Sequence, residues 1–105
     1  MEINDGSTLS NLQLIVPADL PGSADWISRL TTGASIVAVG KMVESPGKQQ
    51  TLEMQVAAVT LIGDCDSSTY PLQKKRHSFE FLRTIAHLRP RTNTLGAVAR
   101  LRNAL

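Results

Sequence analysis

The residues able to perform acid–base, nucleophilic or metal chemistry are few and scattered in this sequence of 105 residues. His77 and His87 are too far apart to bind one metal from neighbouring turns of a helix, and no set of carboxylates or thiols accompanies them. Cys65 lies between Asp64 and Asp66, whose negative charges disfavour a reactive thiolate. We therefore predict no catalytic residue and no metal site, and we interpret the histidines as ordinary surface or helix-face side chains.

Lysines and arginines are the other polar residues that suggest a function. The turn at residues 45–48 (SPGK) lacks the G-x-x-x-x-G-K-[ST] frame of a phosphate-binding P-loop, so we interpret it as a β-turn in which Lys48 is a candidate phosphate contact. The densest basic cluster is Lys74, Lys75 and Arg76. Such residues add salt-sensitive affinity when they neutralise phosphates, but they are also typical of a solvated linker, and both interpretations remain open.

Length and charge exclude several classes of protein. From its 105 residues we expect one domain, or one domain and a tail, and not a large multidomain enzyme. Its N-terminus resembles no signal peptide and no apolar run is long enough to span a membrane, so we expect a cytoplasmic protein without membrane contact. The two parts of the chain differ in charge: residues 1–60 hold three basic and six acidic residues, net −3, whereas residues 61–105 hold eight and three, net +5.

The first 65 residues are predicted to form mainly β-strands. Apolar runs predict strands at 12–16, 35–43 and 51–62, and a turn at Asp5–Gly6 implies a further strand that is barely present before Asn4. Gly40 predicts a bulge or bend in its strand. The strand at 51–62 is long enough to bend and pair along two edges, and its alternation places one set of residues on a common face: Leu52, Met54, Val56, Ala58 and Thr60.

One short helix is predicted within this β region. It includes Asp25, with Ser23 as the N-cap and Gly33 at its end, and it carries Trp26, the only aromatic residue in 1–65. This order of strands and helix, with glycine-marked bends, fits an OB-fold barrel without its first strand, and an open α+β sheet is the alternative. Because no aromatic falls on a strand, a general single-strand binder is disfavoured.

The rest of the chain is predicted to be a basic linker at 66–77 and two short C-terminal helices within 78–105. Ser78 is a suitable N-cap for the first helix, which Pro90 stops. Thr92 or Asn93 is the cap of the second, whose apolar face is expected to point inward through Leu95, Val98, Leu101 and Leu105.

Several segments resemble asparaginyl-tRNA synthetase of the bacterial and organellar kind, a class IIb aminoacyl-tRNA synthetase. They include INDGS, RLTTGASI, VESPGK and the stretch YPLQKKRHSFEFLRTIAHLRPRTNTLGAVARLRNAL. The resemblance covers essentially the whole chain and is most specific from Tyr70 onward. It implies an N-terminal OB-fold that reads the tRNA anticodon, then a hinge, and then a catalytic domain that uses asparagine, ATP and Mg. For this chain itself we expect no cofactor.

Two positions match anticodon contacts of that family. Gln13 corresponds to the glutamine that hydrogen-bonds the central uridine, and Glu53 corresponds to an acidic residue that reads a base edge. An amide and a carboxylate suit this task, because unpaired bases present donors and acceptors on their Watson–Crick edges. Without the resemblance, both side chains would be interpreted as solvated residues on the outer face of a strand.

The resemblance also sets expectations for the chain as a whole. The family's first strand, its strand with a base-stacking Phe and the class II motifs 1, 2 and 3 have no counterpart here, so we expect an anticodon-binding region and hinge that cannot aminoacylate alone. The expected partners are asparagine tRNA and the catalytic domain of the same enzyme, in a homodimeric parent. The alternative is a free-standing OB-type interaction module that acts in trans with a synthetase or self-associates by strand addition at an open sheet edge.

Overall fold

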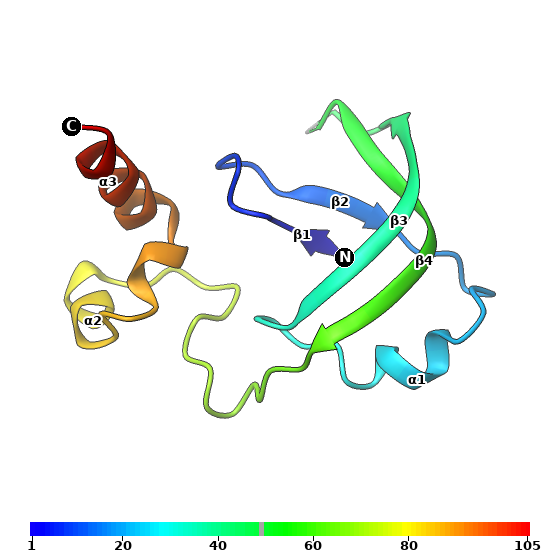
Figure 1. The fold of residues 1–105 in the computed structure, drawn as a ribbon, viewed down its shortest axis with the longest axis horizontal. Coiled ribbons are helices and arrows are strands. Elements are labelled where there is room, and N and C mark those ends of the chain that lie inside the picture. The colour runs from blue at the N-terminus through cyan, green and yellow to red at the C-terminus, as the bar shows by residue number, and fades with distance from the viewer. Residues whose placement is uncertain (49) are drawn as a thin grey trace. The chain divides into compact units, whose positions relative to one another are not determined.

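The computed structural model describes residues 1–48 and 50–105, and the chain divides into an N-terminal unit, Met1–Tyr70, and a C-terminal unit, Pro71–Leu105. The N-terminal unit is a four-stranded sheet with the order β1-β2-β4-β3 and one short helix (Figure 1). This mainly β, partial OB-fold is the predicted fold class. Its elements are β1 (Glu2–Ile3), β2 (Leu12–Ile15), α1 (Ser23–Ile27), β3 (Ser35–Glu44) and β4 (Leu52–Gly63).

Strand β4 is the central element of the sheet because it pairs along both of its edges, as its length predicted. It runs parallel to β2 over three pairs and antiparallel to β3 along the whole of β3. Figure 1 shows β3 and β4 as a long, curved pair of strands. The parallel pairing brings the start of β4 beside β2, although the two segments are far apart in sequence.

A bulge at Gly40 bends the β3–β4 pair, as the glycine predicted. The register shifts between Val39 and Gly40, and a Cβ on Gly40 would lie 2.2 Å from the backbone oxygen of Gln55. Only glycine therefore permits this approach of the two strands. Because of the bulge, the residues of β4 that face the core differ from the predicted ones. Val56 is buried, but beyond the bulge Val59 and Leu61 pack toward the core, whereas Ala58 and Thr60 are exposed.

The core of the N-terminal unit forms where α1 meets the sheet. Leu14 of β2 and Val56 of β4 pack with Leu20 and with Trp26 of α1, which is 7% exposed. The helix begins one residue earlier than predicted: Gly22, with φ 75°, is the N-cap, and Ser23 is the first helical residue. No side chain caps this end, because Ser23 already lies inside the helix.

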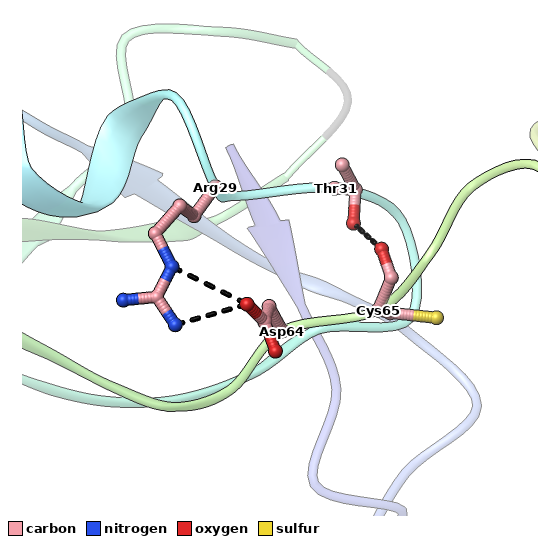
Figure 2. A network of polar contacts seen from close by, with 4 residues as sticks. All are labelled: Arg29, Thr31, Asp64 and Cys65. Carbon is pink, nitrogen blue, oxygen red and sulfur yellow. Dashed lines mark hydrogen bonds and ion pairs between the residues drawn. The ribbon is translucent and has the colours of Figure 1, made fainter.

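Two polar contacts fasten the segment after α1 to the end of β4 (Figure 2). The Arg29 guanidinium donates to one carboxylate oxygen of Asp64, with Nη2 2.9 Å away, and the Thr31 hydroxyl donates to the carbonyl of Cys65. Arg29 lowers the pKa of Asp64 by donating this hydrogen bond and by its positive charge. Both charged side chains are exposed, so the ion pair orients the segment more than it stabilises the fold.

The C-terminal unit contains α2 (Phe79–Thr84), the 3-10 helix η1 (Arg89–Arg91) and α3 (Asn93–Ala104). Ser78 is the N-cap of α2, as predicted, and its hydroxyl accepts from the Phe81 N–H at 3.2 Å. The helix stops at Thr84, well before Pro90. The Thr84 hydroxyl donates to the Phe81 carbonyl at 2.6 Å, a local contact that competes with the helical pattern.

Helix α3 begins after Thr92, one of the two predicted caps, and most of its apolar face is exposed while Leu95 is half-buried. Val98, Leu101 and Leu105 are 46%, 61% and 97% exposed. Among the described residues, no helix is long and apolar enough to cross a membrane.

Candidate nucleic-acid interface

Gln13 and Glu53, the two predicted base contacts, are direct neighbours in the sheet. They are Cα partners in the parallel register between β2 and β4. Paired residues in adjacent strands project to the same face, and here that face is opposite to the one on which Leu14 enters the core. Both side chains are half-buried. The register therefore places an amide and a carboxylate side by side at the surface.

These two residues line a depression that also includes the turn between β3 and β4. We name it the β2–β4 depression, and its volume is about 420 Å³. It contains a predicted phosphate contact as well, because the exposed Lys48 contributes to its lining. The described lining residues are Gln13, Ser45, Pro46, Gly47, Lys48, Gln50 and Glu53.

Gln50 is a member of this site that the sequence did not predict. Its side-chain Nε2 donates a hydrogen bond to Oε1 of Gln13. The residue lies just before β4, where the chain enters the sheet, and it is half-buried. No motif marks such a glutamine, since its role depends on contact with a distant strand. Only knowledge of the β2–β4 pairing would have drawn attention to it.

The chemistry of the depression suits an unpaired nucleobase with its phosphate. An amide supplies one acceptor and two donors, an ionised carboxylate supplies acceptors, and a lysine supplies a positive charge. Together they can satisfy a Watson–Crick edge and neutralise the backbone beside it. The volume is sufficient for a small planar group, and the open surface allows a strand to pass over it.

The remaining predicted phosphate contacts lie in the other unit. Lys74, Lys75 and Arg76 are all exposed and belong to the segment that precedes α2. Within the N-terminal unit, the structure thus brings Gln13, Lys48 and Glu53 together.

The residues with catalytic or metal-binding potential remain dispersed in the structure. Within residues 1–48 and 50–105, no three side chains of His, Cys, Asp or Glu are grouped so as to hold a metal ion. His77 stacks on Phe81, with ring centroids 5.4 Å apart, and its Nε2 lies 3.3 Å from the Gln73 carbonyl. These contacts give His77 a local packing role.

Comparison with known proteins finds several asparagine–tRNA ligases that are similar to this chain, whereas no family model matches it. It is 65% identical over 105 residues to an asparagine–tRNA ligase of Protochlamydia amoebophila and 60% identical over 104 residues to that of Microcystis aeruginosa. The ligase of Rhodopirellula baltica is 56% identical over 105 residues. These alignments cover 99–100% of the chain but only 21–23% of each relative. The resemblance to asparagine–tRNA ligases is therefore confirmed. This chain spans about one fifth of the length of those relatives.

Proposed function

We propose that this chain, which matches asparagine–tRNA ligases along its whole length, is the anticodon-binding region of such a ligase and its hinge. The observation that carries the proposal is the pairing of Gln13 with Glu53 in the lining of one depression. Two residues that the resemblance singled out separately are adjacent in space, on the outer face of the sheet. A single base can then contact both of them.

The proposed mode of binding is recognition of an unpaired base by its hydrogen-bonding edge. Gln13 donates to or accepts from the base, Glu53 accepts a base N–H, and Lys48 lies where a flanking phosphate passes. Lys74, Lys75 and Arg76 add further phosphate contacts along the tRNA. Each such contact raises the affinity and makes it more sensitive to salt.

The activity of the whole protein is inferred in the same way. The ligase would join asparagine to asparagine tRNA with ATP and Mg²⁺, as a cytoplasmic homodimer whose catalytic domain is a partner of this region. None of the residues described above is assigned to ATP, Mg²⁺ or asparagine. The contribution of this chain is to bind and orient the tRNA.

The experiment is a titration of labelled asparagine tRNA, and of a tRNA with a different anticodon, into the purified chain at two salt concentrations. We expect the asparagine anticodon to bind more tightly, and Gln13→Ala to reduce that preference by about fivefold, since one hydrogen bond is lost. Gln55→Ala is the matched control, because Gln55 is an exposed glutamine on β4 that pairs with Ile15 instead. Equal binding of both tRNAs would refute the proposal.

Salt dependence tests the phosphate contacts separately. Lys48→Ala should lower the slope of log affinity against log salt by about 0.7, the value for one phosphate of a single strand. The control is Arg102→Ala, an exposed basic residue of α3 with no assigned contact. A slope that is unchanged by Lys48→Ala would remove Lys48 from the interface.

Self-association is a second candidate function, supported by apolar residues on the outer face of β3 and β4. Val37, Val39 and Ile62 are 51%, 60% and 64% exposed. Surfaces of this kind commonly mark protein contacts. Sedimentation of the chain at increasing concentration should then show a dimer that Val39→Lys abolishes. A monomer at every concentration would exclude this candidate.

A further inference from the structure

We propose that Asp5 is a site of isoaspartate formation, and that the side chain of Asn4 slows this reaction in the folded chain. Asp5 and Gly6 form the only Asp-Gly pair in the sequence, which contains no Asn-Gly pair. An aspartate followed by glycine rearranges most readily, because glycine has no side chain to hinder attack by its own nitrogen. Both residues are exposed and lie in the connection between β1 and β2.

The rearrangement passes through a cyclic imide. The backbone nitrogen of Gly6 attacks Cγ of the protonated Asp5 carboxyl, so that a C–N bond forms, the C–OH bond breaks and the amide proton leaves with the hydroxyl as water. A water molecule then adds to one of the two ring carbonyls. Opening at the backbone carbonyl leaves the main chain running through Cγ, which is isoaspartate, whereas opening at Cγ restores aspartate. The reaction needs only water and is independent of the function proposed above.

Asn4 restrains the nitrogen that must attack. The Gly6 N–H donates to Oδ1 of Asn4 at 2.6 Å, so this bond must break before the nitrogen can lose its proton and approach Cγ. The Asn4 amide is itself held in place from the other side of the loop. Its Nδ2 donates to the carbonyls of Thr8 and Ser10, at 3.2 and 3.1 Å. Asn4 is therefore the positioning residue that we expect to set the rate at Asp5.

The Asp5 carboxyl is also held, and Asp66 provides an internal comparison. Oδ1 of Asp5 accepts from the N–H and the hydroxyl of Ser7, at 2.9 and 2.6 Å. Oδ1 of Asp66 accepts in the same way from Ser68, at 2.8 and 2.6 Å. The residue that follows Asp66 is a serine, whose side chain hinders the nitrogen. We therefore expect slower isoaspartate formation at Asp66 than at Asp5.

Isoaspartate at Asp5 would lengthen the main chain between β1 and β2 by one carbon atom. This connection spans residues 4–11 and joins two strands in which Glu2 is the Cα partner of Gln13. Nδ2 of Asn11 donates to the Glu2 carboxylate at 3.2 Å and ties the end of the connection to β1. The modification is thus placed to loosen the short strand that borders Gln13.

The test is to incubate the chain in mildly acidic buffer, with and without concentrated urea, and to follow isoaspartate by peptide mapping with electron-transfer mass spectrometry. At Asp5 we expect a rate at least about fivefold lower in the folded chain than in urea, the factor expected for one hydrogen bond. Asn4→Ala should raise the rate in the folded chain by about fivefold for the same reason. Asn11→Ala is the matched control. It removes a 3.1 Å contact with Asn4 and leaves the acceptor of the Gly6 N–H, so the rate should change by less than about twofold.

The fluorescence of Trp26 in the core shows whether each variant is folded. An Asn4→Ala chain that is folded and reacts no faster than the unaltered chain would refute the role of Asn4. Equal rates in buffer and in urea would refute the restraint, and this comparison needs no variant. If Asp5 forms no isoaspartate even in urea, or forms it no faster than Asp66 there, the assignment of the site is wrong.

Discussion

Gly40→Ala should destabilise the fold by about 2 kcal/mol because β4 leaves no room for a methyl group. The new Cβ would lie 2.2 Å from the backbone oxygen of Gln55 and 2.9 Å from its carbonyl carbon. Ordinary contacts begin near 3.4 Å, so the two strands must separate by about 1 Å at the bulge. Overpacking of this kind costs about 1–3 kcal/mol, and the smaller entropy of an unfolded chain with alanine offsets less than about 1 kcal/mol.

Urea unfolding of the chain measures this loss, with Trp26 as the probe. It is the only tryptophan in the sequence and is 7% exposed in the core, so its fluorescence reports the N-terminal unit. A loss of about 2 kcal/mol lowers the midpoint by about 1 M urea for a domain of this size. The slope of the free energy of unfolding against urea should stay the same.

The matched control is Gly47→Ala, in the turn that joins the same two strands. Among the described residues, its Cβ would meet only the Ser45 hydroxyl, at 3.4 Å, so we expect a change below about 0.5 kcal/mol. If Gly40→Ala and Gly47→Ala have equal midpoints, the bulge does not require glycine and the reasoning from the close approach is refuted.

Three further predictions concern the core and the segment after α1. Leu14→Ala should lower the free energy of unfolding by about 3 kcal/mol because Leu14 is only 1% exposed. Ile15→Ala, at a position that is 38% exposed, should lower it far less. Equal urea midpoints for the two variants would contradict this prediction. Arg29→Ala should raise the pKa of Asp64 toward its ordinary value of 3.8, as followed by NMR titration of that carboxyl. The ion pair stabilises the fold at pH values above the unfolded-state pKa of Asp64, and this stabilisation is lost as the pH falls through the folded-state pKa. The unaltered chain and Arg29→Ala should therefore approach the same stability in acid. An Asp64 titration that is the same in both proteins would exclude the pair. Gly33→Ala should cost about 2 kcal/mol of stability, because φ is 96° at Gly33 and the new Cβ would lie 2.8 Å from the Tyr70 ring. When Tyr70→Ala is also present, part of this loss should be restored. No recovery would show that the ring is not the obstacle.

Local signals predicted much of the fold. The short strand before Asn4, the bulge at Gly40 and the N-cap at Ser78 each depend on one or two residues and their backbone preferences, whereas β1 and β2 are joined by residues 4–11 and not by a two-residue turn at Asp5–Gly6. The consequence of the bulge was not predictable in the same way. Alternation along β4 assumes one register, and the extra residue in the bulge exchanges the two faces, which is why Val59 and Leu61 replace Ala58 and Thr60 beside the core.

The candidate site was only partly predictable, because its geometry is non-local. The resemblance identified Gln13 and Glu53 as separate positions, while their adjacency depends on the parallel pairing of β2 with β4. Gln50 carries no sequence signal, because its contact with Gln13 exists only after that pairing forms. A glutamine in a turn is otherwise interpreted as a solvated residue.

Whether Gln13 and Glu53 read one base together is tested most directly by a double-mutant cycle. Affinities for the U-centred anticodon hairpin are measured with Gln13→Ala, Glu53→Ala and the double variant. Because the two residues are cross-strand partners in one depression, we predict that the double variant loses less affinity than the sum of the single losses, by at least about 0.5 kcal/mol. If the losses in the two single variants add up to the loss in the double variant within about 0.3 kcal/mol, the two residues do not share a base. An unchanged affinity in either single variant would also contradict a shared base.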